Sequence, residues 1–383
     1  MIQLKNMVNY IRTFLILTIS STLLWISPVR ADDTDFLKAA FSGEISTLKQ
    51  LLEKGTNVDY QNEMGFSALI VASQYGHTDI VKFLLENNAT IDLKNAGGAS
   101  ALIIAAKNGH ADIVNLLLEK GAQLDTQTTD GITALMLAVQ KGHEAIIDTL
   151  LANGANIHLQ TKEKLTALII AAMEGRATIV DKLLAKNAQV DAQASDNTTA
   201  LYMAARNGHT AIVEKLLAHK AAVNLLAIND TTPLFVAAQN GHTDIVKALL
   251  AKNAKVDLQD KNGATALTLA ALIGNTDIVE LLIKHGAKVD HKATNGFTAL
   301  ILAAQNGHTA TIEALLNNGA TIDLQNNDDV TALMWAALHD HADAVKVLLA
   351  KGASTKLKSK TGKTAAEIAK DPAIKEMLQS VSN

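Results

Sequence analysis

Apolar residues recur along the chain in one arrangement that repeats every 33 residues. In residues 95–127 the first apolar positions have the i, i+3, i+4, i+7 spacing of one helix face, at Leu102, Ala105, Ala106 and Gly109. A second apolar face follows a short polar turn, at Ile113, Val114, Leu117 and Leu118. Gly109 and Gly121 follow these faces and predict the ends of two short helices, because glycine readily adopts the left-handed conformation of a helix stop. A polar segment, residues 122–132, then leads into the next unit as a hairpin.

A serine or threonine occupies one position of every unit, with no insertion or deletion between units: Ser67, Ser100, Thr133, Thr166, Thr199, Thr232, Thr265, Thr298, Thr331 and Thr364. This register predicts nine full repeats, at 62–94, 95–127, 128–160, 161–193, 194–226, 227–259, 260–292, 293–325 and 326–358, with caps at 33–61 and 359–383. One unit of 33 residues buries too little apolar surface to offset the cost of ordering its backbone. The units are therefore expected to stack into an all-α solenoid.

Two positions give specific expectations for the turns. The second helix of a unit is followed by glycine or asparagine in most repeats, whereas Lys220 occupies this position in one of them. Because lysine adopts the left-handed conformation less readily, we expect a looser turn there. Thr364 and Glu367 have the spacing of a capping box at the start of the last repeat helix.

The 33-residue period and the segment TPLFVAAQNGHTDIVKALLAKNA (232–254) resemble the ankyrin repeat, whose pattern includes T-P-L-H-x-A. The proline of that pattern is present only at Pro233. Its histidine is replaced by Ile70, Ile103, Met136, Ile169, Tyr202, Phe235, Thr268, Ile301 and Met334, so we expect apolar packing in place of its hydrogen bonds between repeats. The resemblance implies a protein that binds other proteins through the hairpin tips and the concave face of the first helices.

Residues 1–31 have the pattern of a secretory signal peptide. Lys5 and Arg12 precede an apolar run of 13 residues (14–26), and Val29 and Ala31 provide small side chains before a cleavage site. The alternative is an uncleaved anchor, but 13 helical residues extend only about 20 Å, less than a bilayer core of about 30 Å. We therefore expect an exported domain at 32–383, periplasmic in a Gram-negative cell and otherwise secreted, without membrane insertion after cleavage.

Charge and composition argue against several classes of function. The net charge is −4 and no run of basic residues is present, which disfavours nucleic acid as a partner. The absence of cysteine excludes disulfides and thiol catalysis. TGKT (361–364) resembles the end of a phosphate-binding loop, but Leu357 stands where that motif begins with glycine.

The recurring histidines are the remaining candidates for catalysis or metal binding: His77, His110, His143, His209, His242, His308 and His341. They are spaced one per layer, about 8–10 Å apart, whereas a metal ion needs several ligands close together. We interpret them as turn residues that bond nearby backbone. Most carboxylates recur at equivalent, solvated positions, and no pair stands out as acid and base. The sequence thus predicts no catalytic residue, no metal site and no cofactor.

Candidate partner-binding residues are those that differ between equivalent positions of the loops and first helices: Phe66, Tyr75, Lys107, Ile132, Leu165, Met173, Arg206, Leu272, Ile273, Phe297, Trp335 and His339. Aromatic residues and arginine dominate binding hot spots. Trp335, with Tyr202 and Phe235, is alternatively packed between helices. The proposed anchors are Phe66 with Tyr75, Leu165 with Met173, and Leu272 with Ile273 and Phe297.

The resulting prediction is a monomeric, non-catalytic scaffold that binds a protein or peptide along the concave groove. One alternative is a secreted effector that engages host proteins. The other alternative is an enzyme, which is disfavoured because no segment outside the repeats is long enough for a catalytic domain.

Overall fold

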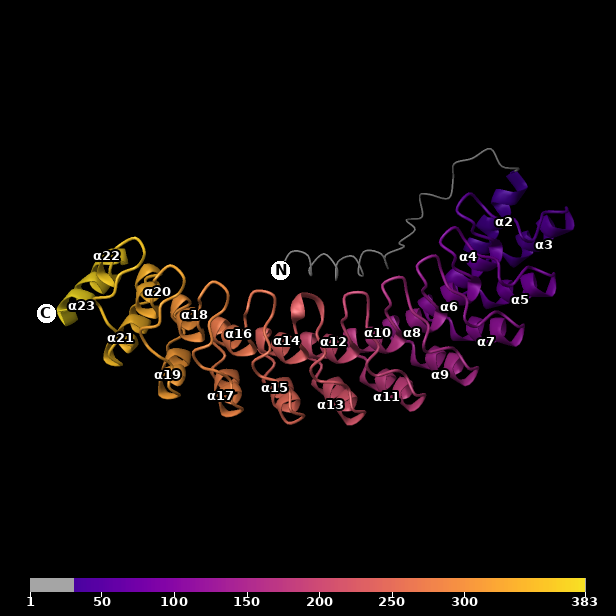
Figure 1. Cartoon of the computed structure of the whole chain (residues 1–383). Helices are drawn as coiled ribbons and strands as arrows, with labels where there is room; N and C mark the ends of the chain where they lie inside the picture. Colours follow the sequence, from indigo (N-terminus) through magenta and orange to yellow (C-terminus); the bar gives the residue numbers. More distant parts are fainter. Residues whose placement is uncertain (1–30, 383) are drawn as a thin grey trace.

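The computed structural model describes residues 31–382, which form an elongated, curved stack of helix pairs (Figure 1). The predicted leader lies outside the described residues except for Ala31, where the first described helix begins. In each pair the first helix and the loop before it lie on the concave side, and the second helix lies on the convex side (Figure 1). The expected all-α solenoid is confirmed.

The first helices of the pairs are α2 (Ala31–Ser42), α4 (Ala68–Tyr75), α6 (Ala101–Asn108), α8 (Ala134–Lys141), α10 (Ala167–Met173), α12 (Ala200–Asn207), α14 (Pro233–Gln239), α16 (Ala266–Ile273), α18 (Ala299–Gln305), α20 (Ala332–Leu338) and α22 (Ala365–Ile368). The second helices are α3 (Ile45–Glu53), α5 (Thr78–Glu86), α7 (Ala111–Glu119), α9 (Glu144–Ala152), α11 (Ala177–Ala185), α13 (Thr210–Ala218), α15 (Thr243–Leu250), α17 (Thr276–Lys284), α19 (Thr309–Asn317), α21 (Ala342–Ala350) and α23 (Pro372–Ser382). One loop contains a 3-10 turn, η1 (Ile228–Asp230), and an isolated bridge pairs Gln61 with Ser67.

The first helices are buried more completely than the sequence pattern predicts. In α6 six of the eight residues, 101–106, are buried, although the apolar stripe predicted only one buried face. The reason is that α6 packs against the first helices on both sides, α4 and α8, and against its own second helix, α7. Ala105 and Ala106 are fully buried, and their small side chains permit this close approach. The second helices keep the expected single apolar face, with Ile113, Val114 and Leu117 buried in α7.

Serine or threonine at the marker position caps most of the first helices, whereas Ser100 makes no capping bond. The Thr133 hydroxyl accepts a hydrogen bond from the Met136 amide at 3.2 Å, which satisfies one of the amides left free at a helix start. The capping box expected at the last repeat helix is confirmed, since the Thr364 amide donates to Glu367 Oε2 at 2.8 Å. These caps explain why the marker residue is conserved in type from layer to layer within the chain.

The glycine–histidine pair forms a contact between successive repeats. Gly76 ends α4 with a φ of 80°, and His110 of the next repeat lies against it. His110 Nε2 donates to the Gln74 carbonyl oxygen at 3.0 Å, and a Cβ atom on Gly76 would lie 2.7 Å from the imidazole ring. The other six histidines of the set make the same bond to a carbonyl 36 residues earlier. The interpretation of these histidines as turn residues that bond backbone is confirmed.

A second set of contacts between repeats comes from carboxylates that the sequence pattern placed in solvent. Asp92 Oδ1 accepts from the Gln123 amide at 3.0 Å, 31 residues later in the chain. The same bond is made by Asp59, Asp92, Asp125, Asp191, Asn224, Asp257, Asp290 and Asp323. Each layer with Asp or Asn at this position therefore forms a hydrogen bond from that side chain to the loop of the next layer.

The expectation of a looser turn at Lys220 is wrong. Lys220 adopts a φ of 63°, in the left-handed region used by glycine at the other turns. The Ala221 amide donates to the Leu216 carbonyl at 3.0 Å, as the Ala122 amide donates to Leu117 at 2.9 Å. The backbone hydrogen bond and the burial of Ala221 hold the turn in this conformation, although the left-handed conformation is unfavourable for lysine.

The contact between repeats 128–160 and 161–193, named here the central junction, is less tightly packed than its neighbours. Helix α8 contacts α10, and α9 contacts α11, less extensively than the equivalent pairs on either side. Three departures from the repeat pattern coincide there. Val139 replaces the small residue that follows the first alanine, His158 replaces the loop aspartate, and Arg176 replaces the turn histidine. The Arg176 guanidinium reaches the Gln140 carbonyl only at 3.5 Å, and its Nε is buried without a partner among the described residues.

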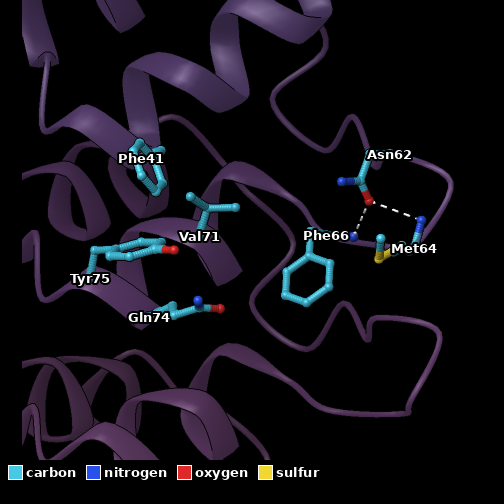
Figure 2. A pocket seen from close by; sticks show the side chains of 7 residues that line it. All are labelled: Phe41, Asn62, Met64, Phe66, Val71, Gln74 and Tyr75. Atoms are coloured by element: carbon cyan, nitrogen blue, oxygen red, sulfur yellow. Dashed lines mark hydrogen bonds between the residues drawn. The ribbon is translucent and has the colours of Figure 1, made fainter. Parts of the chain in front are cut away.

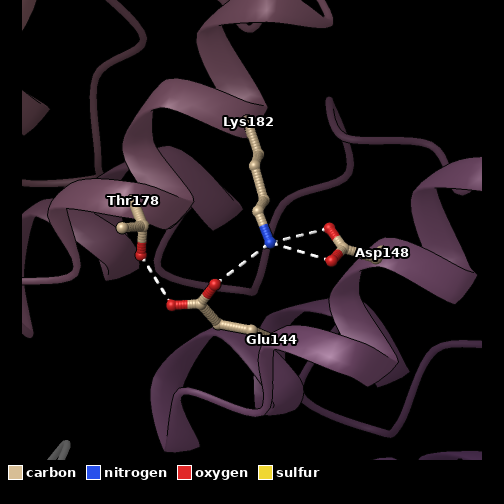
Figure 3. Close-up of polar contacts among 4 residues, drawn as sticks. All are labelled: Glu144, Asp148, Thr178 and Lys182. Carbon is tan, nitrogen blue, oxygen red and sulfur yellow. Dashed lines mark hydrogen bonds and ion pairs between the residues drawn. The ribbon is translucent and has the colours of Figure 1, made fainter.

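Charged side chains join the second helices at the central junction (Figure 3). Lys182 of α11 contacts Glu144 at 3.2 Å and Asp148 at 2.8 Å, and the Thr178 hydroxyl donates to Glu144 at 2.8 Å. Hydrogen bonds from Thr178 and Lys182 hold the pKa of Glu144 below its ordinary value. Because these groups are exposed, each pair contributes little to stability and is sensitive to salt.

We predict that Gly109→Ala destabilises the stack more than Gly121→Ala. Both glycines have a positive φ, 84° and 86°, so alanine is strained at either position, by about 1–2 kcal/mol. Only at Gly109 would the added Cβ also meet the next repeat, at 2.8 Å from the His143 ring. The measurement is the thermal midpoint of both variants and of Gly109→Ala/His143→Ala. Equal midpoints for the two single variants would contradict a steric role for this contact.

We also predict a small stabilising effect of Glu144 that depends on pH. The lowered pKa means that the folded protein favours the ionised carboxylate, so the stabilisation is present above the ordinary pKa of about 4.3. It is lost as the pH falls through the lowered value. Glu144→Gln should therefore lower the thermal midpoint at pH 7, and this difference from the unmodified protein should vanish in acid. Glu119→Gln, on the neighbouring helix α7, is the control for the effect of the substitution itself.

Candidate functional site

The concave side carries the predicted partner-binding residues, and the structure divides them by exposure. Exposed side chains are Tyr75, Leu272, Ile273 and His339, and half-buried ones are Lys107, Ile132, Met173, Arg206, Phe297 and Trp335. Phe66 and Leu165 are buried. The exposed and half-buried residues form groups near the two ends of the groove and a charged stretch between them.

The N-terminal pocket is a shallow hollow of about 340 Å³ that includes open solvent (Figure 2). It is lined by Phe41, Asn62, Met64, Phe66, Val71, Gln74 and Tyr75. Tyr75 is 40% exposed and contacts Phe41 edge to face, with ring centroids 4.6 Å apart. Asn62 shapes the loop, because its Oδ1 accepts from the amides of Met64 and Phe66 at 3.0 and 2.9 Å. The pocket therefore presents a mostly apolar, aromatic wall.

Sequence reasoning missed Phe41, which completes this pocket. Phe41 lies in α2, at the repeat position that Gln74 occupies in α4. The signal was present in the sequence, because extending the comparison of variable positions into the N-terminal cap would have included it. The partial cap is therefore part of the candidate site.

The C-terminal strip consists of Leu272, Ile273, Phe297 and Trp335. Leu272 and Ile273 are 37% and 41% exposed at the end of α16. Phe297 and Trp335 are half-buried and in contact, with ring centroids 5.4 Å apart, and Trp335 stacks on His339 at 5.5 Å. Leu272 and Ile273 end α16, Phe297 lies in the loop before α18, and Trp335 lies within α20. Exposed apolar side chains grouped on one face are the kind of surface that a protein partner covers.

The structure corrects the expectation that Phe66 and Leu165 are exposed anchors. They are 9% and 7% exposed and pack within the apolar core of the stack, whereas Phe297 at the equivalent position is half-buried. Phe66 still forms one wall of the N-terminal pocket, whereas Leu165 belongs to the core, so of that pair of anchors only Met173 remains accessible. Tyr202 and Phe235 are buried as anticipated, and Trp335 is only partly so.

One loop differs from all the others along the stack. The loops are joined by backbone bonds such as that from the Thr129 amide to the Gly97 carbonyl at 2.9 Å, and such a bond is present at the neighbouring positions. Within residues 31–382 this series lacks the bond from the Ile228 amide to the Asp196 carbonyl. Leu226 replaces the glutamine or lysine of other repeats, and it and Ile228 are 42% and 38% exposed. Here the loop ladder is interrupted and two apolar side chains face solvent.

No group of three or more His, Asp or Glu side chains is placed to hold a metal ion among residues 31–382. Over the same residues, none of the helices combines the length and apolar character that crossing a bilayer requires.

Comparison with known families identifies the repeat. The sequence model of the family described as ankyrin repeats (3 copies) matches residues 36–128, 93–161, 135–227, 168–260, 220–293 and 286–359. The chain therefore belongs to the ankyrin repeat family, whose repeats generally mediate protein–protein interaction. A search of curated proteins finds no match.

The departures of this chain from the family pattern now have a structural explanation. The residues that replace the family histidine are buried, so packing takes its place at most of these positions. Tyr202 is an exception, because its hydroxyl lies 3.1 Å from Thr231 Oγ1 of the next loop and keeps a polar contact between repeats. Thr268 instead bonds within its own repeat, to Thr265.

We predict that Leu226→Gln stabilises the interrupted loop. In another repeat, Gln127 Nε2 donates to the carbonyls of Gly131 and Gln160, at 2.8 and 3.1 Å. A glutamine at 226 should make the equivalent bonds and raise stability by about 0.5–1.5 kcal/mol, measured by thermal unfolding. The matched control is Gln127→Leu, which should lower stability by a similar amount. An unchanged midpoint for both variants would show that these bonds contribute nothing.

Proposed function

We propose that this protein is an exported, non-catalytic scaffold that binds a protein or peptide along its concave groove. The observation that carries the proposal is the C-terminal strip, in which the exposed Leu272 and Ile273 stand at positions where other repeats place polar residues such as Gln239, Gln305 and Asn306. Export is supported by the pattern of residues 1–31, with a periplasmic location in a Gram-negative cell and secretion otherwise. The protein is proposed to act as a monomer.

The uniformity of the layers supports a binding role for the few residues that vary. Turn histidines and loop aspartates are nearly the same in each repeat and form contacts between repeats, and the caps are nearly the same and stabilise the start of each first helix. The groove positions contribute only their backbone carbonyls to the turn-histidine bonds, so their side chains can differ without loss of these contacts. Recognition is thus assigned to the variable residues on the concave face, with aromatic and aliphatic anchors near its ends.

The test is replacement of the strip in the mature chain, residues 32–383. Leu272→Ala/Ile273→Ala/Phe297→Ala should reduce capture of the partner at least about tenfold, because removing apolar anchors typically costs more than 1 kcal/mol each. The partner is first identified by affinity capture from the producing cell's envelope and, separately, from host lysate. The source of the retained protein also distinguishes an envelope scaffold from a host-directed protein.

The matched control changes three apolar residues on the convex side. Phe83→Ala/Leu116→Ala/Leu281→Ala alters half-buried side chains that share one position of the second helices. This variant should retain the partner, and circular dichroism should show that both variants are folded. Unchanged capture by the strip variant would refute the proposed binding surface.

A further inference from the structure

The groove next to the N-terminal pocket is positively charged in a chain with a net charge of −4. The two residues that close each first helix from α2 to α20 are variable, and the charged ones are Lys107, Lys141, Glu174 and Arg206. The first two lie at the ends of α6 and α8, which pack side by side. Two cations thus lie next to each other on the concave surface.

Lys107 and Lys141 lack a carboxylate partner in the described part of the chain. No ion pair or side-chain hydrogen bond is formed by either ammonium group there. Lys107 is half-buried, and burial, followed by repulsion from Lys141, lowers its pKa. A helix C-terminus favours a cation by a few tenths of a kcal/mol, but this does not account for two cations side by side. The attraction of a bound carboxylate would offset both the lost hydration of Lys107 and its repulsion from Lys141.

The cationic pair is continuous with the N-terminal pocket. Gln74 lines that pocket in α4, and Lys107 occupies the same repeat position in the adjacent helix α6. The exposed Tyr75 and the ring of Phe41 provide an apolar wall one layer before the first lysine. Three successive layers therefore offer an aromatic pocket and then two positive charges.

We propose that this N-terminal part of the groove binds an extended peptide segment of a protein partner that carries one bulky apolar side chain followed by two carboxylates. The proposal rests on the proposed function and names the chemistry of the partner at one end of the same groove. The apolar side chain enters the N-terminal pocket, and the carboxylates pair with Lys107 and Lys141. Glu174, at the position of Lys141 in the next layer, ends the cationic stretch and disfavours a third carboxylate.

The distance between adjacent layers determines how many residues separate the apolar side chain of the peptide from its two carboxylates. Adjacent first helices lie about 8–10 Å apart, and an extended chain advances about 3.3 Å per residue. The two carboxylates are therefore expected about three and six residues from the apolar side chain.

The experiment measures fluorescence anisotropy of labelled nonapeptides with the folded mature chain. The acidic probe is GFGSEGSEG, and its comparisons are the neutral GFGSQGSQG, the basic GFGSKGSKG and the anchorless GAGSEGSEG, each also made in reversed order. The acidic probe should bind about threefold to tenfold more tightly than the neutral one, and this preference should fall with added salt.

Variants of the protein assign the effect to named groups. Lys107→Ala/Lys141→Ala should remove the preference for the acidic probe and its salt dependence, and Tyr75→Ala should weaken the acidic and neutral probes alike. Glu174→Gln should tighten binding of the acidic probe. The control Lys120→Ala/Lys252→Ala removes the same charge from exposed sites that follow the second helices and should change nothing.

Equal binding of acidic and neutral probes, or a preference that survives removal of both lysines, overturns the proposal. Absence of binding by every probe also overturns it. Neither result bears on the Leu272, Ile273 and Phe297 variant, so failure here is distinguishable from failure of the proposed function.

Discussion

The burial of each layer's apolar faces against the next layer is the constraint on which this structure depends. A first helix such as α6 is buried on nearly all sides, and only the helices of neighbouring repeats can provide that cover. The alanine pair present in most first helices keeps the layers close. Close layers in turn bring the turn histidine against the preceding glycine and the loop aspartate within reach of the next loop. The polar contacts between repeats are thus consequences of a spacing that packing sets.

The sequence predicted the features that recur in every repeat. It was less successful with features that depend on contacts between neighbouring repeats. Helix pairs, caps and turn histidines followed from the 33-residue register, because each is encoded within one unit. The Asp92 bond to the Gln123 amide was missed, because an aspartate in a polar loop looks solvated until the next loop is placed beside it. Lys220 adopts the same turn as the glycines, since the backbone hydrogen bond from Ala221 outweighs the low preference of lysine for the left-handed conformation.

The sequence predicted which surface carries the candidate site, and the structure corrected the exposure of single residues on that surface. Variable positions do lie on the concave side, as the repeat geometry implied. Leu165 was wrongly expected to be exposed, because the chain pattern does not show that it packs into the apolar core of the stack. Phe41 was omitted because it lies in a partial repeat, yet it forms the pocket together with Tyr75. Exposure and side-chain partners are properties of adjacent layers, and one layer's sequence does not contain them.

The central junction has a mechanical consequence for recognition. Val139 and Arg176 place larger side chains where other layers have small ones or histidine, and Lys182 links the second helices through exposed charges that water and ions weaken. Because α8 and α10, and α9 and α11, pack less extensively than their neighbours, we expect the solenoid to bend more readily there than within the two arms on either side. The N-terminal pocket lies on one arm and the C-terminal strip on the other. Bending there would change the distance between the two contact regions. Partners of different length could then bind both regions through the same contacts.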